Sequence, residues 1–382
     1  MTVDYTCPSA TNGLGVPVPT RLATTFYTTP PPLSAQGYAR IHSIIVGSDD
    51  IYFAAADDDG PMIRTVKTDG TGESVAFQDP SFAPFSRLAG YGQTLFWFDQ
   101  SGDPGRVVEW QIGSPTPSVA FDAVLMGDLG EIEQYFDASN NHFILANVRD
   151  QAGTWRSEIL RKNANDGSID VLHARSTMLG GAQQLAYALF GDTFYVAGPS
   201  TDGGDLVGVL PIASGGPPID PATPPDVVPV LEAPCAVLVA LGETNLWCLG
   251  GFETVGQIPD VKEQQVLRAM RRDPATGDRT WYTLFDTYQQ PDEPGRGAFS
   301  TEAATNGSDL YFVTSEVVDG TGGVVSTLYK ATDTGSGFEV STVLCNLPEI
   351  TDMTLTGGSL YYATFINDLD RLDEHGLWRL DL

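Results

Sequence analysis

Basic residues are scarce in this chain of 382 residues: 20 Lys and Arg stand against 49 Asp and Glu, for a formal net charge of −29. Nucleic acids and anionic membranes are bound through basic surfaces, so this balance argues against both as partners. It is compatible with cations, basic proteins or neutral ligands such as sugars. The simpler interpretation is that the acidity keeps an exported protein soluble and monomeric.

Long apolar runs and catalytic signatures are missing as well. No stretch approaches the ~18–20 apolar residues that span a bilayer, so we expect no membrane span. The motifs HExxH, GxSxG and the P-loop are absent, and the four histidines are scattered along the chain. No residue pattern therefore indicates a particular reaction. A sustained helical period is also absent, so we expect little helix.

Cysteine is rare, with four residues and no CxxC pair, and no His lies at zinc-site spacing from them. An even number in a chain poor in Lys favours disulfides and an oxidising compartment, with reduced buried thiols as the alternative. Of the three connectivities we favour Cys235 with Cys248, which closes the shortest loop. Cys7 with Cys345 would then hold the N-terminal segment.

The first residues contain no basic and apolar signal peptide, so the chain is either cytoplasmic or has lost a leader. The Pro-, Thr- and Ser-rich stretch up to Thr20 favours the second interpretation. We therefore expect a secreted protein or one of the cell envelope.

Turn residues are abundant, with 41 Gly and 26 Pro, and they punctuate a repeat. A turn is followed seven times by a short strand rich in aromatic residues. The copies are Ile51-Tyr52-Phe53, Leu95-Phe96-Trp97, His142-Phe143-Ile144, Phe194-Tyr195-Val196, Leu246-Trp247-Cys248, Leu310-Tyr311-Phe312 and Leu360-Tyr361-Tyr362. A strand-based repeat of roughly 40–50 residues is typical of a β-propeller with one blade per repeat.

The first repeat shows how a blade is built. Short runs of high β-propensity at 40–46, 51–55, 62–67 and 74–77 are separated by turns, which predicts a four-stranded antiparallel meander. The fold class predicted is all-β: a seven-bladed β-propeller of four-stranded blades. Residues 1–19 form a tail and 20–382 a single propeller, with blades near 38–78, 85–121, 131–173, 182–231, 233–286, 297–345 and 349–382.

The ends of the chain predict how the ring closes. Residues 376–382 align with the third strand of a blade, so the seventh blade lacks its outer strand. The unmatched segment 20–27 has β-like sequence. We expect it to pair with the last strand and so close the ring, which removes exposed strand edges.

The repeat, with Gly-Ser-Asp-Leu-Tyr-Phe at 307–312 and Leu-Tyr-Lys at 328–330, resembles the bacterial TolB-like and YWTD-like β-propeller superfamily. The resemblance covers nearly the whole chain, and its motifs are architectural. The strict YWTD tetrapeptide is absent. What the resemblance implies is a fold and a habit of binding partners, without catalytic residues.

The inner strands provide the candidate ligand-binding residues, because they line the central channel of a propeller. In each repeat a small residue starts the turn between the first and second strands. The residue five positions before it lies on the inner strand, and it is polar in five of the seven repeats. Gln184, close to the apolar Ala186, would serve the fourth blade. The candidates are His42, Arg87, Gln134, Gln184, Glu302 and Asp352.

Three interpretations of this ring remain open. The polar side chains would merely hydrogen-bond to ordered water in the channel, which is the favoured interpretation. Alternatively, Arg87 would take a carboxylate or phosphate, and the acids an amine or a metal. In a catalytic version, Glu302 and Asp352 would form an acid/base pair, if repulsion raised the pKa of one of them. An error of one residue in the count would turn each side chain away.

The connections between strands divide the molecule into two faces. First-to-second and third-to-fourth connections are short, whereas second-to-third connections and blade crossovers are long and acidic. The long-loop face is therefore the expected binding surface for a protein, a carbohydrate or a small polar ligand. Crossover aromatics such as Tyr288 would stack on sugars or, more commonly, fill gaps between blades.

Only one cofactor merits consideration. Asp57-Asp58-Asp59-Gly60 has oxygen ligands suited to Ca²⁺ but lacks the alternating spacing and the downstream Glu of a calcium loop. A solvated turn is the favoured interpretation, and we expect no bound cofactor. The leading functional prediction is a non-enzymatic exported binding protein, and the alternative is a lyase or hydrolase acting at the channel.

Overall fold

The structure is a computed structural model of residues 1–382, and it describes the chain in separate ranges. These are 2–4, 18–23, 41, 43–57, 60–78, 88–99, 105–125, 133–136, 140–149, 155–176, 186–190, 193–199, 205–211, 226–227, 237–240, 245–255, 262–272, 275–276, 278–288, 298–306, 308–317, 324–366 and 374–382. The described residues are mostly β-strand, as the sequence predicts. None of their segments forms a helix long and apolar enough to cross a membrane.

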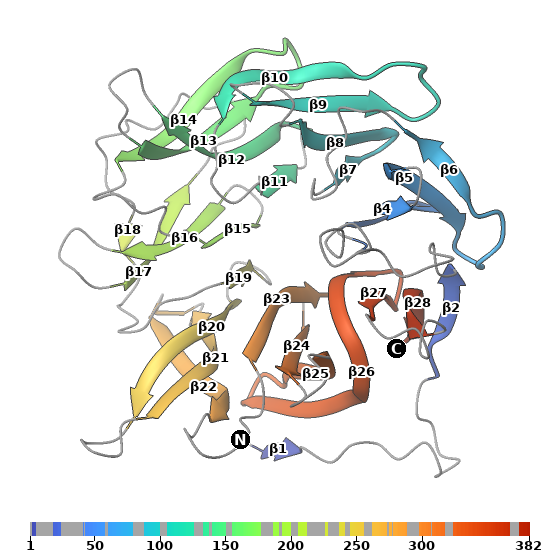
Figure 1. Ribbon diagram of the computed structural model, residues 1–382. Helices are drawn as coiled ribbons and strands as arrows, with labels where there is room; N and C mark the ends of the chain where they lie inside the picture. Colours follow the sequence, from blue (N-terminus) through green and yellow to red (C-terminus); the bar gives the residue numbers. More distant parts are fainter. Residues whose placement is uncertain are drawn as a thin grey trace.

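The strands form antiparallel sheets of four in chain order (Figure 1). Sheet 1 contains β3 (Ile44–Val46), β4 (Asp50–Asp57), β5 (Gly60–Lys67) and β6 (Ser74–Phe77). Sheet 2 contains β7 (Ala89–Tyr91), β8 (Thr94–Asp99), β9 (Gly105–Gln111) and β10 (Ser118–Leu125). Sheet 3 contains β11 (Glu133–Phe136), β12 (His142–Arg149), β13 (Trp155–Lys162) and β14 (Ile169–Ser176).

The next two sheets repeat this plan. Sheet 4 contains β15 (Ala186–Phe190), β16 (Thr193–Pro199), β17 (Asp205–Pro211) and β18 (Asp226–Val227). Sheet 5 contains β19 (Val237–Ala240), β20 (Asn245–Val255), β21 (Lys262–Arg272) and β22 (Arg279–Tyr288). The strand predicted at 40–46 is shorter than expected, since β3 begins at Ile44.

The last strands form one larger sheet because β26 (Phe338–Thr356) is long enough to serve two units. Its first half pairs with β25 (Val324–Asp333), and its second half, from Glu349, pairs with β27 (Ser359–Phe365). Sheet 6 is therefore β23 (Ala298–Thr305), β24 (Asp309–Val317), β25 and the first half of β26. Sheet 7 is the second half of β26, β27, β28 (Gly376–Asp381) and β2 (Thr20–Ala23). No crossover loop separates these two sheets.

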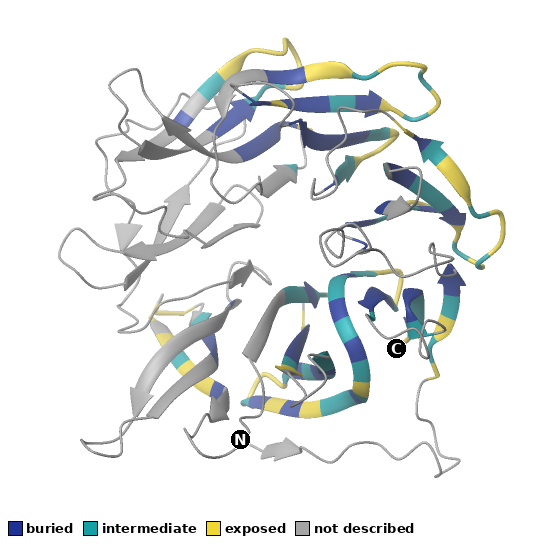
Figure 2. Ribbon diagram, viewed as in Figure 1, coloured by how far each residue is buried: buried dark blue, intermediate teal, exposed yellow. Residues whose placement is uncertain are grey.

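The first strands of the sheets lie toward a common centre, and the fourth strands lie at the periphery (Figure 1). Successive first strands contact one another: β7 with β11, β15 with β19, β19 with β23, β23 with β26, and β26 with β3. Buried core clusters lie between sheets 1 and 2, 2 and 3, 5 and 6, 6 and 7, and 7 and 1. This arrangement buries the middle strands most deeply (Figure 2).

The aromatic second strands fill the spaces between sheets on both sides. In β24, Leu310 and Phe312 belong to a core cluster shared with sheet 5, whereas Tyr311 and Val313 belong to one shared with sheet 7. Consecutive residues of a strand point to opposite faces, so a strand buried on both faces reads as a continuous apolar run. The aromatic strands of the sequence repeat therefore form hydrophobic core between the sheets. Trp97 and Trp247, both 0% exposed, are further examples.

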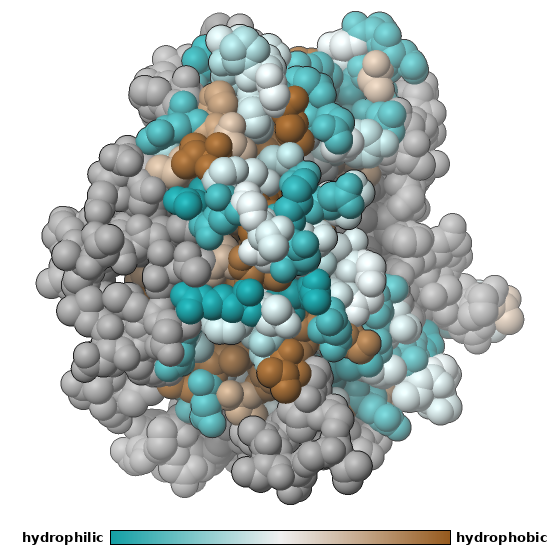
Figure 3. Space-filling view, turned by 90° about the vertical axis from the view of Figure 1, so that its right-hand side faces the viewer, coloured by the Kyte–Doolittle hydropathy of each residue, from teal (hydrophilic) through white to brown (hydrophobic). Residues whose placement is uncertain are grey.

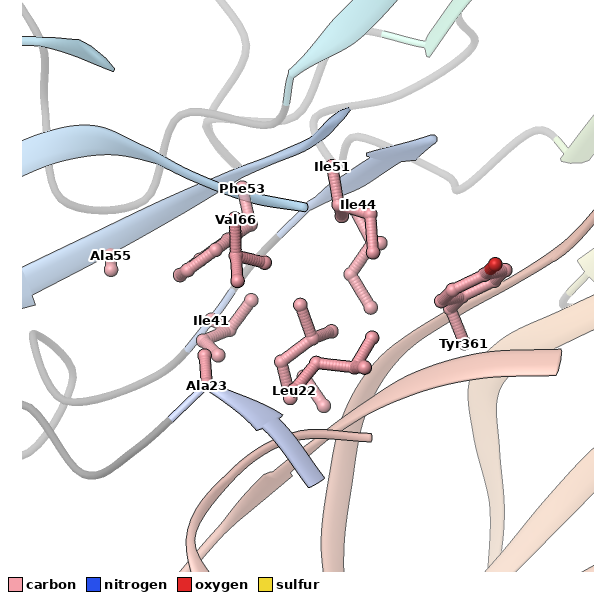
Figure 4. Packing of buried hydrophobic residues seen from close by; sticks show 11 residues of the cluster. Leu22, Ala23, Ile41, Ile44, Ile51, Phe53, Ala55, Val66 and Tyr361 are labelled. Carbon is pink, nitrogen blue, oxygen red and sulfur yellow. The ribbon is translucent and has the colours of Figure 1, made fainter. Parts of the chain in front are cut away.

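The predicted pairing of the N-terminal segment with the last strand is present: β2 pairs antiparallel with β28. Leu22 and Ala23 pack in one core cluster with Ile41 and with Ile44 and other residues of sheet 1 (Figure 4). The segment was expected to span 20–27, and residues 24–27 lie outside the described ranges. A strand that the sequence did not predict, β1 (Thr2–Asp4), pairs in parallel with the first half of β26.

Two arginines bind the turn of a following sheet. Arg271 of sheet 5 pairs with Asp333, donates to the carbonyl oxygen of Gly335 at 3.1 Å and stacks over Phe338 at 4.8 Å. Arg379 of sheet 7 donates to the carbonyl oxygen of Thr68 in sheet 1 at 2.8 Å. These contacts join neighbouring sheets at the ends of their third strands.

Candidate functional site

Two candidate residues, Glu302 and Asp352, lie on neighbouring first strands. Glu302 is in β23 and Asp352 is in the second half of β26, and these strands contact each other. Both side chains are of intermediate burial. The structure therefore brings the two predicted acids onto adjacent strands near the centre of the molecule.

Each acid lies at a break in strand register that the sequence did not reveal. The pairing of β23 with β24 shifts between Phe299 and Ala303, and that of β26 with β27 shifts between Ile350 and Asp352. Extra residues in one strand re-aim the side chains next to them and interrupt the simple alternation. Counting back by a fixed number of residues therefore locates these acids on the strands but does not predict their direction.

Of the other four candidate residues, the structure describes only the backbone of one. Gln134 lies in β11, where it pairs with Ile144, and its side chain is outside the described part of the structure. His42, Arg87 and Gln184 fall outside the described residues. That these residues line a central channel accordingly stays a prediction.

The connections between strands alternate between the two ends of each sheet. Tight turns join the first two strands, as at Gly357-Gly358, where both glycines have positive φ (60° and 81°) and join β26 to β27. Such backbone angles suit a two-residue hairpin and favour glycine. Second-to-third connections lie at the opposite end because the strands are antiparallel, and in sheets 2 to 6 they span 100–104, 150–154, 200–204, 256–261 and 318–323. Third-to-fourth connections lie at the same end as the tight turns and are of similar length, as at 68–73, 112–117 and 163–168.

Two connections differ most clearly from the predicted lengths. In sheet 1, β4 ends at Asp57 and β5 begins at Gly60, so the acidic turn expected to be a long loop is a short hairpin connection. In sheet 4, β17 ends at Pro211 and β18 begins at Asp226, so a long connection lies at the end expected to have short turns. In sheets 1 to 5 the third-to-fourth connection is at least as long as the second-to-third one, so the expectation about loop length was wrong there. Strand ends depend on pairing that composition does not show.

Acids at the short-turn end have structural partners. Asp69 accepts hydrogen bonds from the amide and hydroxyl of Thr71 at 2.9 and 2.7 Å, and Asp166 accepts the amide of Ser168 at 2.9 Å. These hydrogen bonds lower the pKa of both carboxyl groups. Asp333 likewise accepts the amide of Gly335 at 2.8 Å. Such side chains stabilise turns and are poor candidates for binding a ligand.

The opposite end contains a buried carboxylate paired with an exposed arginine, and a buried histidine. Asp99, at the end of β8, is fully buried and pairs with Arg106 at 2.9 Å. His375 is 2% exposed just before β28, and Arg21 of β2 donates to its carbonyl oxygen at 3.2 Å. Burial, with the positive charge of Arg21, lowers the pKa of the His375 imidazole to about 4.

His142 of β12 is deeply buried, with 4% of its surface exposed. Its ring lies 4.5 Å from the rings of Phe96 and Phe136 and 5.0 Å from that of Phe121. Burial, with the charge of Lys162, lowers the pKa of this imidazole to about 3. His142 therefore acts as an uncharged core ring between sheets 2 and 3.

No group of three or more His, Cys, Asp or Glu able to hold a metal occurs among the described residues. Asp58 and Asp59, the centre of the calcium candidate, lie outside them. Among the cysteines, Cys345 lies in β26 and is disulfide-bonded. Cys7 and Cys235 are outside the described ranges, and of Cys248 only the backbone position in β20 is described.

Comparisons with known proteins leave the family open. No protein-family model matches the chain, and no curated protein matches it. Solved structures that resemble it include a nidogen/laminin complex (14% identity, 64% of this chain and 80% of that chain, TM-score 0.39). Others are TolB from Acinetobacter baumannii (11%, 78% and 67%, 0.41) and a glucose dehydrogenase (16%, 77% and 94%, 0.44).

Each of these matches has a TM-score below 0.5. At these identities and TM-scores they carry no argument about the activity of this chain.

Proposed function

We propose that the protein is a non-enzymatic, exported binding protein, built as a seven-bladed β-propeller. Its acidic long-loop end and channel mouth would be the binding surface. The observation that carries the proposal is topological: the second-to-third connections and the connections from one sheet to the next emerge at the same end of the sheets, and the latter, at 78–88, 126–132, 177–185, 228–236 and 289–297, are long. Rigid strands that present several loops at one end form a common type of binding surface.

A closed ring is part of this proposal. β2 pairs with β28, and Leu22 and Ala23 share a core cluster with residues of both sheet 7 and sheet 1. The contact from Arg379 to Thr68 joins the same two sheets. These contacts support closure of the ring by the N-terminal strand.

The partner would be a basic protein segment, a carbohydrate or a small polar ligand, and the protein would act as a monomer. The excess of acids favours a cationic partner by long-range attraction and disfavours nucleic acid. On the face in Figure 3, hydrophilic groups predominate among the described residues, with hydrophobic groups in small patches.

A charge-neutralisation experiment tests the binding surface. The variant Asp57→Asn/Asp58→Asn/Asp59→Asn removes three acids at the proposed binding end, and Asp69→Asn/Asp166→Asn removes acids at the opposite end. A poly-lysine peptide and a glycan array serve as probes, and affinity for the peptide is measured by calorimetry at two salt concentrations. We expect the first variant to bind the peptide several-fold more weakly and the second to bind as the parent does. An equal effect of both variants would contradict the assignment of the binding face.

The alternative function is a propeller lyase or hydrolase acting at the channel. It is favoured by the position of Glu302 and Asp352 on adjacent first strands. Two carboxyl groups close together repel each other, which raises the pKa of one and suits an acid/base pair. His42 and Arg87 would complete this site.

Substitution of Glu302 separates the two functions. If a screen of lyase and hydrolase substrates detects turnover, Glu302→Ala should abolish it while ligand binding persists. Binding without turnover in the parent protein supports the first proposal. If neither binding nor turnover is found, a purely structural assembly module is the remaining interpretation.

A calcium ion at residues 57–60 is tested separately. We expect an unchanged melting temperature in the presence of a chelator, in line with a protein that needs no cofactor. A chelator-dependent fall in Tm that Ca²⁺ reverses would show instead that this turn, or another acid cluster, binds the ion.

A further inference from the structure

The N-terminal residues lie along two outer edges of the molecule. β1 pairs in parallel with the first half of β26, on the edge of sheet 6 that β25 does not occupy, while β2 occupies the outer edge of sheet 7. We call β1 and β2 together the N-terminal strap. The register of β1 pairs Thr2 with Glu339, Val3 with Val340 and Asp4 with Ser341. Three residue pairs make a short strand, and parallel pairing is slightly less stable per residue than antiparallel pairing.

The disulfide of Cys345 lies on the same strand as this pairing. Cys7 follows Asp4 by three residues, whereas Cys345 follows Ser341 by four. β26 contains one extra residue in this interval, which accounts for the difference of one residue. Thr342 and Leu344 of β26 are two positions apart, but their partners in β25, Tyr329 and Leu328, are consecutive. If β1 continues in the same register, Cys7 comes opposite Cys345.

This placement suits a disulfide. Neighbouring strands are about 4.8 Å apart, which falls within the usual separation of about 4.4–6.8 Å between the Cα atoms of bonded cysteines. The alternative partner Cys248 belongs to β20 of sheet 5. Its neighbour Trp247 packs against Phe338 and Val340 of sheet 6, and consecutive positions of a strand belong to opposite faces. The position of Cys248 is therefore on the face away from sheet 6.

We propose that Cys7 and Cys345 form a disulfide that locks the N-terminal strap across sheets 6 and 7, and that a dithiol reductant unlocks it. One thiolate of the reductant attacks a sulfur of the disulfide and forms a mixed disulfide. Its second thiol then displaces the protein sulfur, which leaves two protein thiols and a cyclic oxidised dithiol. Two electrons and two protons pass to the protein. Without the bond, β1 leaves the edge of β26 at Glu339–Ser341. This inference does not depend on the proposed function.

Trypsin offers a clean assignment of the disulfide. Cleavage after Lys and Arg places Cys7 in peptide 1–21 and Cys345 in peptide 331–371, while Cys235 and Cys248 share peptide 176–262. Under non-reducing conditions we expect mass spectrometry to find peptides 1–21 and 331–371 joined. A product that joins 331–371 to 176–262 would overturn the pairing.

A second experiment tests the lock in the folded protein. A dithiol is added, and hydrogen exchange at residues 339–341 is measured together with Tm. We expect faster exchange there and a fall in Tm of about 5 °C. Cys7→Ser and Cys345→Ser should each reproduce this fall, without a further effect of the dithiol at this site, whereas Thr6→Ser should not. Unchanged exchange and Tm after complete reduction of Cys345 would refute the lock, and this arm needs no variant that folds.

Discussion

Individual buried side chains in this protein are kept uncharged by their surroundings. His142 lies against three phenylalanine rings, and burial holds its pKa at about 3. His375 is similarly buried, with a pKa of about 4. Both values lie below the 6.5 of an exposed imidazole, so the unfolded chain binds more protons than the folded one between these limits.

Acid should therefore destabilise the fold before the carboxyl groups titrate. The contribution of each uncharged histidine to the unfolding free energy is fully present above about pH 6.5. It falls as the pH drops toward 4, by up to about 1.4 kcal/mol per pH unit for each histidine. Urea unfolding at pH 7, 6 and 5 measures this slope. His142→Phe, which keeps an aromatic ring in the site, should reduce the slope by about one proton. An unchanged slope would show that His142 is not responsible.

The Arg271 side chain is the second residue with a large expected effect. It combines an ion pair, two carbonyl acceptors and an aromatic face, which a Lys would not reproduce because it lacks the planar fork. We expect Arg271→Ala to cost about 2 kcal/mol of unfolding free energy. Lys67→Ala is a matched control, since Lys67 pairs with Asp50 at the surface and should cost less than about 1 kcal/mol. Equal losses in denaturant titrations would contradict the role of Arg271 as a clamp.

At the scale of elements, strand β2 has the clearest consequence. Leu22 is 4% exposed between sheets 1 and 7, whereas Val18, just before the strand, is 81% exposed. Leu22→Ala should cost about 2–4 kcal/mol because it leaves a cavity between the sheets. Val18→Ala in the same segment should change the unfolding free energy by less than about 0.5 kcal/mol. Similar values for both would mean that β2 contributes little to the fold.

Gly376 allows β2 to lie close to the start of β28. Its φ is +144°, and an added Cβ would lie 2.6 Å from the carbonyl oxygen of Ala23. A side chain at the start of β28 would therefore push β2 away. The sequence displays this Gly as one more turn residue, and only the pairing of two strands far apart in the chain gives it a specific role.

At the scale of the whole molecule, self-repulsion opposes folding. A net charge of −29 on a compact body is unfavourable, and salt screens it. We expect Tm to rise as NaCl increases from low to physiological concentration, measured by calorimetry at pH 7.5, with sucrose at matched osmolality as the control for non-ionic effects. A falling Tm would mean that the ion pairs between strands and sheets outweigh the net repulsion.

Much of the architecture was predictable because its signals are local. The turns and the apolar runs of β4, β8, β24 and β27 are contiguous in the chain, and burial on both faces makes them continuous apolar segments. The unmatched segment near Thr20 followed from counting strands. These features need only the nearest neighbours in the chain.

Other features depend on contacts between distant residues and left no mark in composition or period. They include the parallel pairing of β1, the continuity of β26 through two sheets, the register breaks beside Glu302 and Asp352, and the bond from Arg379 to Thr68 across 311 residues. Local sequence does not encode which edge a strand joins or where an extra residue is accommodated. Packing of the folded sheets sets both, and with them the direction of the two candidate acids.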